Sequence, residues 1–171
     1  RYVPTGGEVD TSMTPEEYRR LLETCDAKFK AYEAAGCETY FNKKDHLWTL
    51  YEYENGEFRL PDGAEDGMIY GGCNCGNCHI TIASNGDIMA CRRVTDSRVA
   101  NVWEDRLADV WLCQMEQYRD YDRFKKCGKC ELKAWCRGCP AVANGTCGDF
   151  YGADPQCWKK KNDITGEELP C

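Results

Sequence analysis

The chain has 171 residues, a formal net charge of -7 and a sequence pI near 5.0. This length allows one ordinary domain, or a small domain with part of another, around a real apolar core. The acidic balance argues against nucleic acid as a partner, because binding to phosphate backbones needs a basic surface. The sequence shows no basic start followed by an apolar stretch and no run of about 18 apolar residues, so we expect a cytoplasmic protein without a membrane partner.

Cysteine dominates the composition, because the chain has 14 cysteines and only 2 histidines. Most of the cysteines occur in short-spaced groups, which is typical of metal ligands rather than of disulfides spread along a chain. Thiolate-only ligation favours zinc or iron-sulfur clusters. The clustered candidates are Cys73, Cys75, Cys78, Cys91, Cys127, Cys130, Cys136, Cys139, Cys147 and Cys157. These thiols are enough for two four-ligand centres.

One helix is predicted near the N-terminus. Residues 1–7 are typical of a strand that enters a glycine-rich loop, and the start without Met indicates a piece of a longer protein. Thr14, Pro15 and Glu17 then combine an N-cap, a proline at the first helical position and a capping box, and Gly36 predicts the helix end. The expected buried face consists of Tyr18, Leu21, Leu22, Cys25, Phe29 and Tyr32, and Cys25 and Cys37 are both expected to be small core residues.

Residues 43–60 fit two alternatives. Their apolar spacing fits a short helix that ends at Asn55 and Gly56, whereas the same Asn-Gly pair also fits the turn of a β-hairpin. We favour the helix. Residues 61–67 are polar and rich in turn formers, and we place a domain boundary there. The expected domains are residues 1–67, residues 68–158 and a frayed tail over residues 159–171.

A hairpin is predicted beyond this boundary. Strands near Ile80 and Ile88 flank an Asn-Gly turn, so Cys91 should return close to the cysteines at the start of the hairpin. Apolar residues at helical spacing then predict a helix within residues 101–124. Cys113 lies off that apolar stripe, and we expect it to be a free thiol at or near the surface.

The order of the cysteines carries a resemblance to a known family. Gly86 is followed after four residues by Cys91, and after a gap come Cys127-x2-Cys130-x5-Cys136, a further cysteine almost at once, and a last cysteine after another gap. This order resembles the SPASM domain, the auxiliary-cluster module of radical S-adenosylmethionine enzymes. Residues 101–107 are similar to the segment that commonly follows the Gly-x4-Cys element. Residues 1–17 look like the last strand and helix of the partial barrel that precedes the module.

The resemblance implies an α+β fold: a β-hairpin, helices and long loops around two iron-sulfur clusters, preceded by the closing strand and helix of a partial (β/α) barrel. Carried over by position, it implies two auxiliary 4Fe-4S clusters. The second cluster would be held by Cys127, Cys130, Cys136 and Cys157, and the first by Cys73, Cys78, Cys91 and Cys139.

Two departures from the family pattern affect these ligand sets. Only two residues separate Cys136 from Cys139, where the family usually has three, and this departure bears on the assignment of Cys139. The upstream group offers three thiols where at most two are needed. Whether Cys75 or Cys147 replaces an assigned ligand therefore stays open.

The chain lacks the Cys-x3-Cys-x2-Cys motif that holds the catalytic cluster in such enzymes. We therefore expect that this fragment alone is not catalytic, and that S-adenosylmethionine and a third 4Fe-4S cluster bind only in the parent enzyme. The resemblance implies a parent that modifies or crosslinks a ribosomally made peptide and exchanges electrons with a ferredoxin or flavodoxin. The auxiliary clusters would then transfer electrons, position the substrate, or both.

Arg92 bears on the type of parent enzyme. Sulfatase-maturing members of the family have an aspartate at this position, so the arginine favours peptide crosslinking over sulfatase maturation. The alternative is that Arg92 only stabilises the charge of an anionic thiolate cluster.

Two further interpretations compete with an iron-sulfur module. In a zinc-binding interaction module, each set of four cysteines would hold one tetrahedral ion and support contacts with a partner protein. In an extracellular disulfide-linked protein, no free thiols would remain.

Overall fold

We describe the protein from a computed structural model, which covers residues 13–65 and 67–170. The strand expected within residues 1–7 lies outside the described residues. Within the part of the chain that is described, no helix combines the length and the apolar character needed to cross a membrane.

The first helix, α1, spans Pro15–Ala34 and begins as the sequence predicts. The Glu17 amide donates a hydrogen bond to Thr14 Oγ1 (3.2 Å), and the Thr14 amide donates to Glu17 Oε2 (2.9 Å), which completes the capping box. The buried face is narrower than predicted. Tyr18 and Leu22 are buried, but Leu21 is 39% exposed and Tyr32 53% exposed.

The two isolated cysteines of this region behave differently. Cys25 is half-buried and packs against the core beneath α1, close to what the sequence predicts. Cys37 is exposed, so its prediction as a core residue is wrong. It lies beyond the last residue of α1, Ala34, and is therefore not part of the buried face of the helix.

The second helix, α2, spans Leu47–Glu54 and confirms the helical alternative for residues 43–60. Leu47 and Leu50 are almost completely buried, and Trp48 and Tyr51 are buried beside them. This burial decides between the alternatives, because a hairpin would have sent neighbouring side chains to opposite faces.

A small antiparallel sheet follows. Its strands are β1 (Thr81–Ile82), β2 (Asp87–Met89) and β3 (Arg98–Asn101), in the order β1-β2-β3. Thr81 pairs with Met89, which confirms the predicted hairpin. The third strand was not predicted, because four residues are too few to show a clear alternation of apolar and polar side chains. A short 3₁₀ turn at Thr95–Ser97 precedes this strand and lets it pair with β2.

The helix predicted within residues 101–124 is present, but it is shorter than the apolar stripe from Leu107 to Tyr118 indicates. Asn101 ends β3, α3 spans only Leu107–Leu112, and two 3₁₀ turns follow at Gln114–Tyr118 and Tyr121–Arg123. Two further short elements were not predicted as helices, a 3₁₀ turn at Cys127–Lys129 and the helix α4 at Pro140–Cys147. Short helices and one small sheet thus make up a mixed fold.

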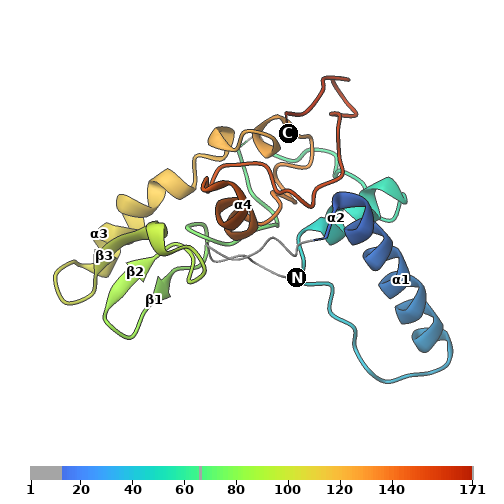
Figure 1. The fold of residues 1–171 in the computed structure, drawn as a ribbon, viewed down its shortest axis with the longest axis horizontal. Coiled ribbons are helices and arrows are strands. Elements are labelled where there is room, and N and C mark those ends of the chain that lie inside the picture. Colours follow the sequence, from blue (N-terminus) through green and yellow to red (C-terminus); the bar gives the residue numbers. More distant parts are fainter. Residues whose placement is uncertain (1–12, 66, 171) are drawn as a thin grey trace.

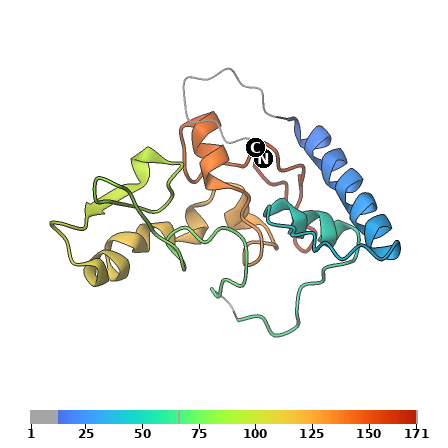
Figure 2. The same cartoon turned by 90° about the horizontal axis from the view of Figure 1, so that it is seen from below.

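Two apolar cores lie at opposite ends of the molecule. Figure 1 shows the sheet and α3 at one end and α1 and α2 at the other, with α4 between them, and Figure 2 shows the same order from below. The sheet-side core contains Ile88, Val94, Ala100, Val110, Met115, Tyr118, Phe124, Cys127, Ala141 and Phe150, among others. The helix-side core contains Tyr18, Leu22, Leu47, Trp48, Leu50, Tyr51, Leu132, Cys136 and Trp158.

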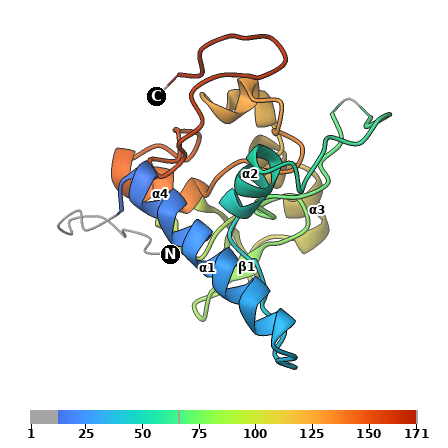
Figure 3. The same cartoon turned by 90° about the vertical axis from the view of Figure 1, so that its right-hand side faces the viewer.

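The helix-side core joins segments that are far apart in the sequence. α1 and α2 lie side by side on this end of the molecule (Figure 3) and pack against Leu132, Cys136 and Trp158. The Trp158 indole also donates a hydrogen bond to Glu54 Oε2 at 2.9 Å. The predicted domains 1–67 and 68–158 therefore share one apolar core.

The C-terminal segment packs on this core, so the prediction of a frayed tail is wrong. Lys159 is 5% exposed and forms an ion pair with the buried carboxylate of Glu131 at 2.9 Å. Leu169 is also buried, and Lys161 pairs with Glu168 in an isolated β-bridge. The charged composition hid this packing, because a buried ion pair and an exposed charge look the same in a sequence. Cys171 lies outside the described residues.

Candidate metal centres

The second predicted ligand set lies on two tight turns and one loop. The 3₁₀ turn at Cys127–Lys129 lets the Cys130 amide donate to the Cys127 carbonyl at 3.1 Å. The next turn lets the Cys136 amide donate to the Leu132 carbonyl at 2.7 Å. Such turns bring sulfur atoms with short sequence spacing to one side of the backbone.

All four thiols of this set line one pocket, which we call the helix-side pocket. Its lining consists of Cys127, Cys130, Cys136 and Cys157 with Leu50, Lys126, Leu132, Gly138, Lys159 and Leu169. Sulfur is therefore the only metal-binding donor type that the side chains of this pocket offer. The cavity among these side chains has a volume of about 20 Å³.

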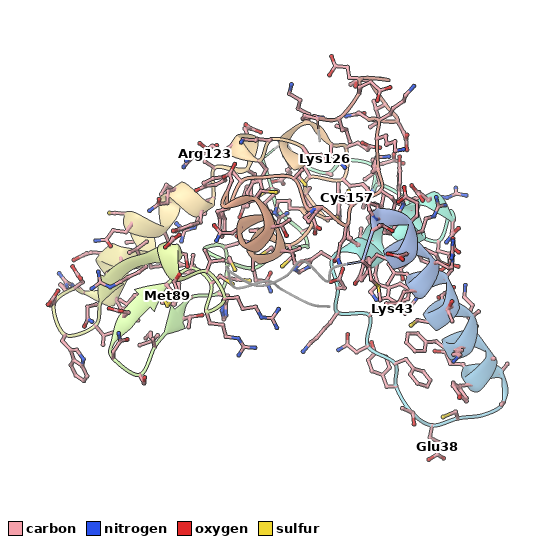
Figure 4. The ribbon with its side chains drawn as sticks, viewed as in Figure 1. Glu38, Lys43, Met89, Arg123, Lys126 and Cys157 are labelled. Carbon is pink, nitrogen blue, oxygen red and sulfur yellow. The ribbon has the colours of Figure 1, made fainter. Side chains whose placement is uncertain are left out.

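Burial disfavours the charged form of these thiols. It raises the pKa of Cys130 and of Cys136 to about 12 and that of Cys127 well above its usual range. Burial also raises the pKa of Cys157, although the nearby Lys126 ammonium opposes this shift. Lys126 Nζ donates to the Cys157 carbonyl at 2.9 Å, and Figure 4 shows the two side by side. Thiols held in this way become thiolates only when a cation compensates the charge.

A second pocket, the sheet-side pocket, is lined by four other thiols. Its volume is about 370 Å³, and its lining consists of Cys73, Cys75, Cys91 and Cys139 with His46, His79, Arg92, Arg93 and Ala141. Three of these thiols belong to the predicted first set. The fourth member of that set, Cys78, is exposed and does not line the pocket, whereas Cys75 does.

The thiols of Cys73, Cys75 and Cys91 form a hydrogen-bonded group. The Cys75 thiol is hydrogen-bonded to both of the others. These hydrogen bonds lower the pKa of Cys73 and of Cys91 and raise the pKa of Cys75 itself. The His46 side chain also bonds to Cys73 and lowers its pKa further. Part of this group can therefore lose protons more easily than the buried thiols of the helix-side pocket.

Hydrogen bonds from their backbone amides hold two cysteines of the sheet-side pocket in place. The Cys91 amide donates to Ser97 Oγ at 3.1 Å, and the Ser97 hydroxyl lies within hydrogen-bond distance of the carbonyls of Cys91 and Val94. The Cys139 amide donates to Asp154 Oδ2 at 2.8 Å. Asp154 is itself buried, so this contact is shielded from water.

The chain crosses between the pockets at Gly138. Cys136 lines the helix-side pocket and Cys139 the sheet-side pocket. Gly138 has φ +58, and a Cβ atom built on it would lie 2.6 Å from the Cβ of Asp154. Glycine therefore fits this position for two reasons, its left-handed backbone and its close approach to Asp154.

Sequence reasoning missed several residues of the sheet-side pocket. His46 comes from the residue before α2, and His79 forms an isolated bridge with Cys75. The only signal for them was that the chain has just 2 histidines. Arg93 also lines this pocket, and Arg92, which the sequence analysis singled out, lies beside it.

The remaining cysteines lie elsewhere. Cys113 is exposed, as predicted. Cys147 is exposed too and lines a different pocket, together with Lys125 and Lys160. Within residues 13–65 and 67–170, no three or more His, Cys, Asp or Glu side chains converge in a way that could hold a single metal ion.

The donor chemistry of the pockets fits thiolate-bound clusters. Four sulfur ligands are what a 4Fe-4S cluster needs, and each pocket presents four thiols. The Tyr121 hydroxyl is buried without a hydrogen-bond partner among the described residues, and burial raises its pKa although the guanidinium groups of Arg137 and Arg119 oppose this shift.

Comparison with known proteins connects this site to a domain. Residues 73–140 match SPASM, an iron-sulfur cluster-binding domain. The matched range contains Cys73, Cys91 and Cys139 but ends before Cys157. The SPASM domain is known from radical SAM-type enzymes, and the relatives described next belong to that class.

Two curated relatives resemble the chain beyond this range. An AdoMet-dependent heme synthase from Methanosarcina barkeri is 26% identical over 162 residues, which cover 91% of this chain and 45% of the relative. An AdoMet-dependent heme synthase from Nitratidesulfovibrio vulgaris is 25% identical over 182 residues, which cover 99% of this chain and 46% of the relative. The chain thus spans about half the length of the curated relatives it matches. No solved structure matches it.

Proposed function

We propose that this chain is the auxiliary-cluster part of a radical SAM enzyme and holds two 4Fe-4S clusters. The observation that carries the proposal is the pair of four-thiol pockets, which overlap the range that matches the iron-sulfur domain. The helix-side cluster would be held by Cys127, Cys130, Cys136 and Cys157. When bound, such clusters supply or accept single electrons.

For the sheet-side cluster we propose Cys73, Cys91 and Cys139 together with one of Cys75 and Cys78. Cys78 is the ligand expected from the resemblance. Cys75 is supported by its place in the pocket lining. Cys75→Ala and Cys78→Ala form a matched pair, and the variant that loses the sheet-side cluster identifies the ligand.

The metal content of the whole chain tests the proposal. After anaerobic reconstitution we expect about eight iron and eight sulfide per chain, with visible absorption that zinc cannot give because of its closed shell. Stoichiometric zinc without iron or sulfide would replace the proposal with the zinc-binding interaction module. A chain without free thiols under denaturing, non-reducing conditions would point instead to a disulfide protein.

The partition of ligands is tested by single substitutions. Cys130→Ala should remove the helix-side cluster and Cys91→Ala the sheet-side cluster, each leaving about half of the iron. Cys139→Ala should behave like Cys91→Ala. If paramagnetic resonance shows that Cys139→Ala loses the same cluster as Cys130→Ala, the two ligand sets proposed here are wrong.

For the parent enzyme we propose modification or crosslinking of a ribosomally made peptide, with a ferredoxin or flavodoxin as electron partner. The support is the family resemblance together with an arginine at position 92 in place of the aspartate of sulfatase-maturing members. The residues of this chain would contribute by holding the clusters and by shaping the sheet-side pocket, where Arg92, Arg93 and His46 face the thiols.

A second candidate is a role in heme synthesis. It is favoured by the two relatives named AdoMet-dependent heme synthase, whose similarity extends over 91% and 99% of this chain. Mass spectrometry of the parent enzyme's products separates the candidates. Formation of heme would support the second, and a mass change in a peptide substrate would support the first.

A further inference from the structure

A buried arginine lies on the segment that links the two thiol pockets. Arg137 is 2% exposed, although arginine is almost never buried without compensation. In the sequence it follows Cys136, which lines the helix-side pocket, and precedes Cys139, which lines the sheet-side pocket. None of the roles described above accounts for a cation at this position.

The guanidinium is held in a fixed position by neutral groups. Its Nη1 donates to the Lys133 carbonyl at 2.8 Å, and its Nη2 donates to the carbonyls of Gly71 at 2.7 Å and Cys73 at 2.9 Å. Its central carbon lies 4.7 Å from the centre of the Tyr121 ring. These contacts satisfy hydrogen bonds and orient the side chain, but they do not neutralise its charge.

The surrounding backbone is shaped around this side chain. Gly72 has φ +77, and a Cβ atom built on it would lie 3.2 Å from Nη2 of Arg137. The segment that carries Cys73 therefore wraps closely around the guanidinium. Through the Cys73 carbonyl, Arg137 touches the backbone of a ligand that lines the sheet-side pocket.

The ionisable groups that act on Arg137 come from both pockets. Burial lowers its pKa, and the Tyr121 hydroxyl and the thiols of Cys73, Cys136 and Cys127 oppose this shift. Among the described residues, no carboxylate forms an ion pair with it. This fixed cation is thus hydrogen-bonded to the Cys73 carbonyl and adjacent in sequence to Cys136, and thiols of both predicted ligand sets act on its charge.

We propose that Arg137 is the shared counter-charge of the two clusters, which stabilises their reduced states and thereby raises both reduction potentials. The inference rests on the proposed function, because a cluster with four thiolate ligands carries a net negative charge. Two anionic clusters would supply the compensation that the carbonyls around Arg137 do not. Reduction adds a further negative charge, so a fixed cation nearby favours it.

The test compares charge and geometry at this position in the whole reconstituted chain. Arg137→Met removes the charge and keeps the apolar stem, Arg137→Lys keeps the charge, and Arg106→Met removes a charge that is exposed on the surface. Reduction potentials come from redox titrations followed by paramagnetic resonance. We expect Arg137→Met to shift both reduction potentials to more negative values. Arg137→Lys and Arg106→Met should shift each potential much less.

Each outcome decides between the proposals. If the unsubstituted chain holds no iron-sulfur cluster, the proposed function fails and the inference falls with it. If both clusters form but Arg137→Met leaves their potentials unchanged or shifts only one of them, only the shared counter-charge is wrong. If Arg137→Met does not retain iron, the iron content of Arg137→Lys, which keeps the charge, is compared with that of Arg137→Gln, which is polar but neutral. More iron in the lysine variant supports the role of charge, and equal losses overturn it.

Discussion

Gly138 shows how a single residue sets the path between the two thiol pockets. It shares a left-handed backbone with Gly148, which has φ +69, but only at Gly138 would a Cβ atom meet a neighbour. Alanine in this conformation costs about 1–2 kcal/mol at either position. The added clash with Asp154 should cost about 1–3 kcal/mol more at Gly138 alone.

We therefore expect Gly138→Ala to lower the free energy of unfolding more than Gly148→Ala does. Because Asp154 holds the Cys139 amide, Gly138→Ala should also reduce the iron bound at the sheet-side pocket. Urea unfolding and iron analysis of both variants check this. An equal decrease in the free energy of unfolding for the two alanine variants would show that the contact with Asp154 does not affect stability.

Asp26 provides a prediction about pH. This carboxylate of α1 is buried, and it accepts contacts from Lys30 at 2.7 Å and Lys43 at 3.0 Å. Burial alone would raise its pKa, but the hydrogen bonds from the two lysines outweigh burial and hold the pKa below its ordinary value. The stabilisation is thus present above about pH 4 and is lost as the pH falls through the lowered pKa.

We expect Asp26→Asn to cost about 1.5–3 kcal/mol in the free energy of unfolding at neutral pH, the range for hydrogen bonds to charged groups. The difference between the two proteins should be the same at pH 8 and pH 5, because Asp26 is ionised throughout this range. Urea unfolding at both values measures it. A difference that already shrinks at pH 6 would contradict the lowered pKa.

At the scale of elements, the helix start at Thr14 and the turn at Asn85 and Gly86 could be predicted because both depend on local hydrogen bonds and backbone preferences. The helix predicted within residues 101–124 is longer than α3, because the apolar residues from Leu107 to Tyr118 fit one helical face. The structure instead buries Val110 from α3 and Met115 and Tyr118 from the following 3₁₀ turn, and it leaves Leu107 47% exposed. Packing against the sheet overrides the local pattern there.

Leu21 and Leu22 test the corrected face of α1. The helical pattern places both on the buried side, but Leu22 is 3% exposed and Leu21 is 39% exposed. Leu22→Ala should therefore cost about 2–5 kcal/mol of unfolding free energy, whereas Leu21→Ala should cost much less because much of its surface already contacts water. Thermal or urea unfolding of the two neighbours provides a matched comparison. Similar costs would mean that α1 packs differently.

The candidate site could be predicted in part from the sequence, because short spacings between cysteines can be recognised without knowledge of the fold. The resemblance assigned Cys136 and Cys139 to different clusters, and the two line different pockets, but their ligation stays a prediction. His46 and Arg137 could not be foreseen in the same way. Their roles depend on contacts with Cys73, which is separated from Arg137 by 64 positions.

At the scale of the whole molecule, the presence of two apolar cores leads us to expect two regions whose stability depends on different clusters. Cys75, Cys91 and Cys139 pack against the sheet-side core, and Cys130 and Cys157 against the helix-side core. Cluster binding contributes folding energy in small metal domains, because the ligands are fixed only when the metal is bound. Loss of one cluster should therefore loosen mainly the core beside it.

Hydrogen exchange of the reconstituted chain tests this division. We expect Cys130→Ala to reduce protection in α1 and α2, and Cys91→Ala to reduce protection in β2 and β3. Cys113→Ala, at an exposed thiol, should change neither region. If Cys130→Ala and Cys91→Ala each reduce protection equally at both ends, the two cores unfold as one cooperative unit. Cys127 gives a reason to measure this, because it belongs to the sheet-side core yet lines the helix-side pocket.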